Sequence, residues 1–571
     1  MIPYRVAQGF FLQKNGKREG CRLKKTISIT GRYLWIPITP GAKDSIVSFY
    51  FKGKKIQEMC IETGEEEPRF YAWLDAAAYQ GLAVTLEGDY AEPWFDYVMV
   101  RDEKPCNPGK SRPLIHYTPE FGWLNDPNGL IYHNGVYHIY HQHNPYGVRW
   151  ENMHWAHTST PDFLSYTQTE DVLFPEEEGP VFSGTAIMDQ NNCLGFGDDA
   201  IAYFYTSAGG RSHWSEDHLF TQKMAVSTDH GKTLKRRDKS VLPHIKEENR
   251  DPKVFYHKDS RFYIMVLYIS DNTFYFFRSK DLYEWEKIQE ITVPGMWECP
   301  DFFPLVCEED GVKKWVLWSA DGYYCLGEFD GQCFQAQKNK EGKGFARYQL
   351  YDIMKDGRNK VDRNFVRPYA AQTFQGTGDR ILQLNWITSI KKDSNYAGIL
   401  SLPAELGLTA SSKGYRICIN PAKELEKLRR ETFETVLETG EDQASDPCTV
   451  SLYSGEGQAL EVELVFRDAR EPGDTGESYI KLSVFETLFF IDLCSRVITV
   501  GPHRICLPEE KEYHLRLYAD TDVFELFVCN GLTYAVTDND SDGVSGSAEV
   551  EFSGIMGSIQ LHVLRGIRII E

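Results

Sequence analysis

The sequence has no paired cysteine motif and no long hydrophobic run. Its 13 cysteines are scattered without a Cys-x-x-Cys pair, which argues against a zinc ribbon and a disulfide framework. The apolar run Phe262–Ile269 has the length of a strand and is far too short to cross a membrane. The first residues show no basic segment followed by an apolar one, so no secretory signal is indicated. We therefore expect reduced thiols and a cytoplasmic protein, although a processed secreted form would present the same sequence.

Positive charge is also scarce. Lysine and arginine number 62 against 83 aspartates and glutamates, a formal net charge of −21. A chain this acidic is a poor candidate for binding nucleic acid or an anionic membrane, and it suits a neutral substrate better than a phosphorylated one. Its hydrophobic content of 42% and charged content of 25% are those of a globular protein and exclude a disordered chain. The length of 571 residues leaves room for about two to four domains.

Strong helical periodicity is rare, and short apolar or alternating runs dominate instead. Aromatic residues make up 13% of the chain, and the runs are bounded by Gly, Asp and Asn, which is typical of an all-β protein. A Pro/Gly-rich linker at 104–110 follows the first of these runs. We therefore expect a β-rich accessory domain over residues 1–108, with candidate strands at Tyr33–Ile38, Ile46–Phe51 and Ala83–Leu86.

The middle of the chain carries a weak repeat with a period of about 60 residues. At least three of the repeated runs are preceded by another strand and a tight turn, and Asn134-Gly135 is a strong hairpin motif. This period fits a four-stranded propeller blade with long loops, so we expect a five-bladed β-propeller over 109–405. The alternative is an array of β-sandwiches with accidental spacing. The repeated apolar runs are Val136–His141, Ile201–Thr206, Phe262–Ile269, Trp315–Ser319 and Ile381–Ile387.

The pattern changes after Pro403. The segment Asn420–Arg429 is the best helix candidate in the chain, with Pro421 at a plausible first helical position. We expect a linker with this short helix over 406–430 and a C-terminal β-sandwich over 431–571. The sandwich is indicated by the alternating runs Leu460–Phe466, Ser478–Phe485 and Val523–Val528.

Three carboxylates occupy corresponding places in the repeat. Asp126, Asp251 and Glu298 each lie just before a strand of the pattern, and each is followed within two residues by a proline. Equivalent starts of the inner strands of a propeller face the same end of its channel, so we expect the three to converge on one axial pocket. Taken singly, each could be an ordinary turn residue. Together they suit glycosidic bond cleavage, which needs one carboxylic acid and one carboxylate, and crowding raises the pKa of one of them.

These motifs resemble those of glycoside hydrolase family 32, the β-fructofuranosidases that include invertases, inulinases and levanases. The resemblance rests on Trp-Leu-Asn-Asp-Pro-Asn-Gly at 123–129, Arg-Asp-Pro at 250–252, Glu-Cys-Pro at 298–300 and Phe-Ser-Gly-Thr at 182–185. It runs from about residue 116 to 386, and more weakly beyond. It implies a five-bladed propeller with a β-sandwich behind it, and retaining hydrolysis through a covalent fructosyl-enzyme.

The resemblance also implies roles for single residues. Asp126 corresponds to the nucleophile, Glu298 to the acid/base, and Asp251 to the residue that holds the 3- and 4-hydroxyls and stabilises the transition state. Retention predicts that the carboxyl groups of Asp126 and Glu298 lie about 5–5.5 Å apart. For Trp150 and Trp386 the alternative is core packing. The implied substrate contacts are Asn125, Gln142, Trp150, Phe182, Ser183, Arg250 and Trp386.

Histidines crowd the segment 116–157, which raises the question of a metal site. On a strand, His141 and His143 share one face and His138 points to the other, so no convergent ligand set is evident. We expect neither a metal nor a cofactor.

The sequence thus predicts an exo-acting β-D-fructofuranosidase that releases fructose from non-reducing ends of fructans and fructo-oligosaccharides, with sucrose accepted as well. Its partner is a fructose-containing oligo- or polysaccharide. The alternatives are a fructosyltransferase on the same scaffold, an inverting propeller enzyme for arabinofuranosides or xylosides, and a non-catalytic fructan-binding protein. The sequence does not rank β-2,1 against β-2,6 linkages, and it leaves open the role of the N-terminal domain and the oligomeric state, a homo-oligomer included.

Overall fold

The computed structural model describes residues 22–570 except 108, 110–111, 198, 343, 353–365, 392, 412–413, 440–446, 456, 472–474, 502 and 540–545. Helix in these residues is limited to α1 (Glu92–Phe95) and the 3-10 turns η1 (Ala77–Tyr79) and η2 (Lys423–Leu428). None of these described helices is long and apolar enough to span a bilayer. The predicted all-β fold is therefore confirmed.

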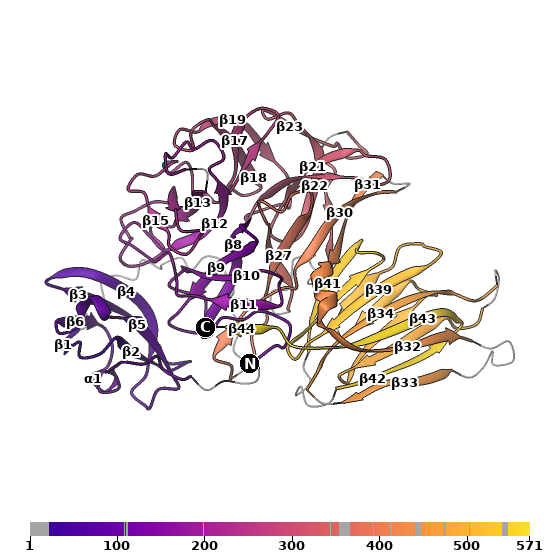
Figure 1. Ribbon diagram of the computed structural model, residues 1–571, viewed down its shortest axis with the longest axis horizontal. Coiled ribbons are helices and arrows are strands. Elements are labelled where there is room, and N and C mark those ends of the chain that lie inside the picture. Colours follow the sequence, from indigo (N-terminus) through magenta and orange to yellow (C-terminus); the bar gives the residue numbers. More distant parts are fainter. Residues whose placement is uncertain are drawn as a thin grey trace.

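The N-terminal domain consists of two small sheets (Figure 1). The two sheets share one apolar core. Side chains alternate between the core and the surface along the strands, and Ile36, Val47, Phe49 and Leu86 are fully buried between the sheets. One sheet has the order β1 (Leu23–Ser28), β6 (Ala83–Gly88), β3 (Lys43–Phe51) and β4 (Lys54–Thr63), and the other has the order β5 (Phe70–Asp75), β2 (Tyr33–Ile38) and β7 (Met99–Arg101).

Five sheets form the blades of the propeller, which confirms the predicted repeat. The predicted apolar runs are β9, β13, β17, β21 and β27, the second strand of each blade. These strands are rich in apolar residues because neighbouring blades cover both faces, and every residue of β13 is buried. In blade order, the strands are β8 (Gly122–His133), β9 (Val136–Asn144), β10 (His154–Thr160) and β11 (Ser165–Gln168); β12 (Val181–Met188), β13 (Ile201–Ser207), β14 (Thr221–Ser227) and β15 (Lys235–Arg236); β16 (Arg250–His257), β17 (Phe262–Ser270), β18 (Thr273–Ser279) and β19 (Glu286–Thr292); β20 (Asp301–Val306), β21 (Lys313–Trp318), β22 (Tyr323–Phe329) and β23 (Phe334–Ala336); and β26 (Pro368–Thr373), β27 (Ile381–Ile387), β30 (Ala404–Ser411) and β31 (Gly414–Pro421).

The fifth blade corrects the predicted linker at 406–430. Strands β30 and β31 pair with each other, and β30 pairs with β27, so residues 406–421 belong to this sheet. Pro421 ends β31 and does not start a helix. The turn that follows, η2, is a 3-10 helix in which Leu425 and Leu428 are buried.

The C-terminal domain is a sandwich of two sheets, coloured orange to yellow in Figure 1. Its two sheets enclose an apolar cluster in which Leu464, Leu482 and Leu526 are fully buried, and the three predicted alternating runs fall on β34, β35 and β40. One sheet has the order β25 (Tyr351–Asp352), β41 (Thr533–Asp538), β40 (Val523–Val528), β39 (Tyr513–Ala519), β34 (Ala459–Asp468), β43 (Ile555–Leu564) and β32 (Arg429–Glu438), and the other has the order β33 (Cys448–Gly455), β42 (Gly546–Ser553), β35 (Tyr479–Val484), β36 (Thr487–Asp492), β37 (Val497–Val500) and β38 (His503–Cys506).

The sandwich is tied to the start of the propeller by contacts between distant parts of the chain. Strand β44 (Arg568–Ile570) pairs in parallel with β11 at the outer edge of the first blade. The carboxylate of Asp520 accepts hydrogen bonds from the backbone N–H of Leu114 at 2.7 Å and from His116 Nδ1 at 2.8 Å, while His116 Nε2 lies 2.8 Å from Glu525 Oε1. Burial opposes the charged imidazole, but the two carboxylates outweigh it and raise the pKa of His116 to about 9.

Candidate active site

The inner strands of the first two blades each carry a bulge at the same end. In β8 the two residues Asn125 and Asp126 stand opposite the single residue Gln142 of β9. In β12, Ser183 is the additional residue, inserted just after Phe182. Because a bulge re-aims the side chain that it carries, both strands direct polar groups away from the regular sheet.

Two further inner strands repeat this irregularity. In β16, Asp251 and Pro252 stand opposite Leu267 alone. In β26 the pairing also shifts, between Tyr369 and Gln372. The bulges of the first, second, third and fifth blades therefore lie at corresponding positions.

In the fourth blade a loop, not a bulge, carries the residues that lie at the corresponding position. Glu298 and Cys299 precede β20 and have φ angles of 23° and 46°, and the bulge residues Asp251 and Ala370 have φ angles of 63° and 51°. Left-handed backbone at non-glycine residues costs of order 1–3 kcal/mol each and tends to gather at functional sites.

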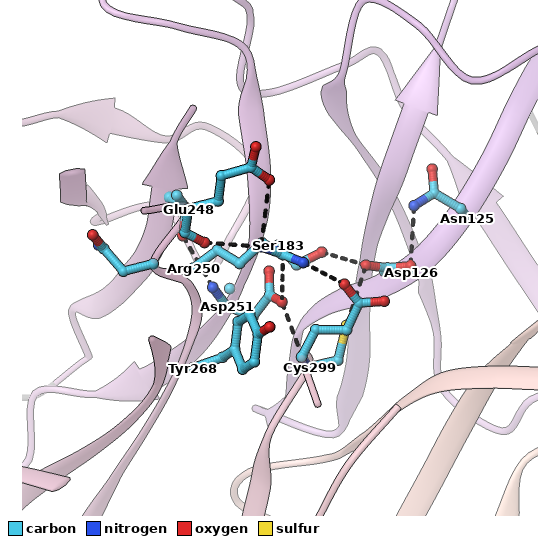
Figure 2. Close-up of polar contacts among 12 residues, drawn as sticks. Asn125, Asp126, Ser183, Glu248, Arg250, Asp251, Tyr268 and Cys299 are labelled. Carbon is cyan, nitrogen blue, oxygen red and sulfur yellow. Dashed lines mark hydrogen bonds and ion pairs between the residues drawn. The ribbon is translucent and has the colours of Figure 1, made fainter. Parts of the chain in front are cut away.

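Asp126 is held by three neighbours (Figure 2). Ser183 Oγ donates to its Oδ2 at 2.6 Å, Asn125 Nδ2 donates to its Oδ1 at 3.0 Å, and Cys299 Sγ lies 3.7 Å from Oδ2. The amide of Asn125 is itself oriented, since its Oδ1 accepts from Trp123 Nε1 at 2.8 Å. Burial raises the pKa of Asp126 above its ordinary value, and the Ser183 and Asn125 donors oppose that rise.

Asp251 is almost fully buried, with 5% of its surface exposed. Its Oδ2 accepts a hydrogen bond from the backbone N–H of Cys299 at 3.0 Å, and its own N–H donates to Thr206 Oγ1 at 3.0 Å. Burial raises the pKa of Asp251 to about 7; Arg250 opposes the rise, and the charges of Glu298 and Asp126 add to it. The three carboxylates therefore interact electrostatically in one cluster.

Glu298 is positioned through both of its oxygens. Arg250 donates to Oε2 at 2.5 Å, and the hydroxyl of Tyr369 donates to Oε1. The guanidinium of Arg250 also lies 3.6 Å from Asp251 Oδ2 and stacks over the ring of Tyr268 at 4.8 Å from its centroid. Arg250 thus bridges two of the three carboxylates, as Figure 2 shows in part.

Aromatic side chains border the carboxylates. Trp150 meets Phe182 edge-to-face, with ring centroids 5.9 Å apart. Trp386 packs against Tyr369 at 6.1 Å and against Trp123 at 5.6 Å. Trp386 Nε1 is buried and has no hydrogen-bond partner among the described residues, and the same holds for Gln142 Nε2. The ten site residues predicted from sequence therefore lie in one neighbourhood.

Two features of this neighbourhood escaped the sequence analysis. One is Tyr369, which no motif marked. The other is a fully buried ion pair between Lys253 Nζ and Asp301 Oδ1 at 2.7 Å, with Thr373 bonded to both partners. It joins β16, β20 and β26. Lys253 and Asp301 each directly follow the proline of a motif and precede a short apolar run, and that coincidence could have revealed the pair.

The histidines of the first blade serve as hydrogen-bonding groups. His143 lies 2.8 Å from Asp171 Oδ1 through Nδ1 and 2.9 Å from the carbonyl of Phe121 through Nε2. Among the described residues, one group has metal-ligand spacing: Glu461, Glu463 and His562, in the sandwich. Arg429 and Arg516 form ion pairs with its two glutamates, which disfavours a cation there.

A cavity of about 1680 Å³ lies at the opposite ends of the inner strands, away from the carboxylates. Its lining includes His257, Val306 and Thr373, the last residues of β16, β20 and β26, together with Glu512 and Asn530 of the sandwich.

A model of the Glycosyl hydrolases family 32 N-terminal domain matches residues 116–421, more than half of the chain. The chain belongs to glycosyl hydrolase family 32. The match begins at the His116 junction and ends with β31, so it spans all five blades and supports the corrected end of the propeller at Pro421. The resemblance seen in the motifs is thereby confirmed.

Two named proteins are similar to the chain in sequence. It is 31% identical over 405 residues to the levanase of Bacillus subtilis (strain 168), covering 66% of this chain and 56% of that protein. It is 30% identical over 342 residues to a fructan beta-fructosidase of Streptococcus mutans serotype c, covering 56% and 22%. The chain thus spans little more than half the length of the first relative and less of the second.

Solved structures share the fold. A fructofuranosidase from Schwanniomyces occidentalis in complex with fructosylnystose superimposes with a TM-score of 0.67 at 21% identity, over 80% of this chain and 98% of that one. An exo-inulinase from Aspergillus awamori gives 0.66 at 22% identity, with the same coverage. These likenesses confirm the architecture of propeller and sandwich.

Proposed function

We propose that this family 32 member is a retaining, exo-acting β-D-fructofuranosidase that removes fructose from non-reducing ends of fructans and fructo-oligosaccharides and also cleaves sucrose. The observation that carries the proposal is the meeting of Asp126, Asp251 and Glu298, from three different blades, in one cluster of oriented donors. The names of the relatives, levanase and fructan beta-fructosidase, support the same substrate class.

In the first step, Asp126 attacks the anomeric carbon of the terminal fructosyl unit while Glu298 gives its proton to the departing glycosidic oxygen. In the second step, Glu298 takes a proton from water, and the water oxygen replaces Asp126 at that carbon. The donors Ser183 and Asn125 stabilise the negative charge that the nucleophile needs.

Asp251 and Arg250 have a different task in this mechanism. Asp251 accepts hydrogen bonds from the 3- and 4-hydroxyls of the fructosyl ring, and its charge stabilises the oxocarbenium-like transition state. Arg250 keeps both Asp251 and Glu298 in place through its guanidinium.

The remaining site residues bind the sugar. Trp150, Phe182 and Trp386 supply apolar walls, and the unpaired buried amide of Gln142 suits a sugar hydroxyl, because a buried donor without a partner costs about 1–3 kcal/mol.

A timed product profile on sucrose, 1-kestose, inulin and levan tests the proposal. We expect free fructose as the early product, with the chains shortening one unit at a time. Longer products would indicate a fructosyltransferase, mid-sized fragments would indicate endo cleavage, and no turnover of any substrate would refute the hydrolase. NMR of the first-formed anomer tests retention, since an inverted product would refute the covalent intermediate.

A further inference from the structure

Two loops of the propeller emerge at the end that carries the carboxylates. The β9–β10 connection, residues 145–153, starts where β9 pairs with the beginning of β8, and it carries Trp150. The β13–β14 connection, residues 208–220, starts where β13 pairs with Val181 and Phe182. Both loops therefore border the site.

Strand β4 of the N-terminal domain holds the first loop through its backbone. Asn152 Oδ1 accepts from the N–H of Cys60 at 2.7 Å, and Asn152 Nδ2 donates to the carbonyl of Cys60 at 2.8 Å. The side chain of Asn152 thus pairs with β4 as a neighbouring strand would. Two more residues of this loop contact the N-terminal domain. Tyr146 Oη accepts from Gln57 Nε2 at 3.0 Å, and Arg149, which precedes Trp150, lies 2.6 Å from Asp44.

The same strand holds the second loop through a buried carboxylate. Glu58, with 6% of its surface exposed, accepts the backbone N–H of Trp214 at 2.6 Å and the ammonium of Lys55 at 2.6 Å. Lys55 also lies over the ring of Trp214, 5.5 Å from its centroid. A buried carboxylate is costly unless its partners are fixed, so this contact specifies the position of the loop.

The second loop is linked to the catalytic cluster by a series of ion pairs. Arg211 forms an ion pair with Glu248, and Glu248 Oε2 lies 3.7 Å from Arg250, which binds Glu298. The first loop leads there through Trp150, which contacts Phe182 next to Ser183.

We propose that the N-terminal domain is a working part of the substrate site: strand β4 positions the loops 145–153 and 208–220 and thereby sets the affinity for fructosyl substrates. This inference rests on the proposed function. A domain that only braced the propeller would not need these specific contacts, in which the amide of Asn152 pairs with the backbone of β4 and the carboxylate of Glu58 accepts the N–H of Trp214. Because neither loop carries one of the three acids, its displacement weakens substrate binding more than it slows the chemical steps.

Two positioning residues test the inference, each on one loop contact. Asn152→Gly removes the pairing with Cys60 and tolerates the φ of 49° at this position, and Glu58→Gln removes the charge that meets Trp214. The control is Lys24→Gln on β1, at the opposite edge of the same sheet, which breaks a 3.5 Å ion pair with Glu87. The readouts are kcat and KM on sucrose, 1-kestose and nystose, and amide hydrogen exchange of both loops.

We expect each of the two variants to raise KM about three- to tenfold with kcat within about twofold, in line with the loss of one or two hydrogen bonds. Exchange should accelerate in loop 145–153 for Asn152→Gly and in loop 208–220 for Glu58→Gln, and the control should match the wild type. Faster exchange with unchanged KM, or a fall in kcat alone, would mean that the domain only supports the propeller, and would overturn the inference. A wild type that releases no fructose would refute the proposed function and the inference together.

Discussion

Replacing Asp251 by Asn is expected to raise the stability of the protein at high pH and to lower its activity. The amide oxygen of Asn can still accept the hydrogen bond from the N–H of Cys299, so the local structure is kept and only the charge is removed. In the folded protein Asp251 keeps its proton up to a pH of about 7, whereas the unfolded chain releases it near 3.8. Between these values the folded form binds more protons, and its stability falls as the pH rises.

The size of the effect follows from the same two values. A rise from 3.8 to about 7 is close to three pKa units, and each unit corresponds to about 1.36 kcal/mol, so ionised Asp251 costs the folded state about 4 kcal/mol at pH 8. Asp251→Asn should therefore raise the free energy of unfolding by up to about 4 kcal/mol at pH 8 and change it little at pH 4. The same variant should lose about 100-fold or more in kcat/KM, because it removes a charge that stabilises the transition state.

The assay is urea unfolding followed by tryptophan fluorescence at pH 4 and pH 8, together with fructose release from sucrose. Asp259→Asn is the control, since it removes the same charge from the exposed β16–β17 turn of the same blade. If Asp251→Asn lowered the free energy of unfolding equally at both pH values, the buried and destabilising charge assigned to Asp251 would be refuted. Retained activity would refute its place in the mechanism.

Three other outcomes are expected. Glu298→Gln should lower kcat on sucrose by about 10²–10⁴-fold and far less on aryl fructosides with good leaving groups, and equal losses in steady-state assays would contradict its acid role. Asp126→Asn should give no trapped fructosyl-enzyme by mass spectrometry, and a variant still labelled at the site would remove it as the nucleophile. Lys253→Met should destabilise the propeller by about 3–5 kcal/mol because it leaves Asp301 buried without its partner, whereas Lys253→Met combined with Asp301→Leu should recover most of that loss in denaturant unfolding; no recovery would show that the charge pair is not the cause.

Much of the architecture could be read from the sequence because each blade repeats one physical pattern. The second strand of a blade is covered on both sides, so it is rich in apolar residues, and five such runs at similar spacing predict five blades. The convergence of Asp126, Asp251 and Glu298 followed from their corresponding places in that repeat, at or just before the start of the inner strand of three blades.

The misassigned segments have a local cause. The stretch after Pro403 alternates like a strand, with Leu406, Leu408, Ile417 and Ile419 all turned inward, but a Pro near its end imitates the start of a helix. Tyr369 could not be found in this way, since its partner Glu298 lies 71 residues earlier and no local pattern records the contact. The bulges were equally hidden, because pairing register depends on two strands at once.

The junction around His116 has a consequence for biosynthesis. Leu114 and Asp520 are 406 residues apart in the chain, yet they share a hydrogen bond of 2.7 Å. At a translation rate of about 5–20 residues per second, the partner of this segment leaves the ribosome roughly 20–80 s later. The first blade is therefore made long before the carboxylate that secures the segment leading into it. During synthesis the propeller therefore lacks its contacts with the sandwich, and we expect chaperones to bind it at this stage.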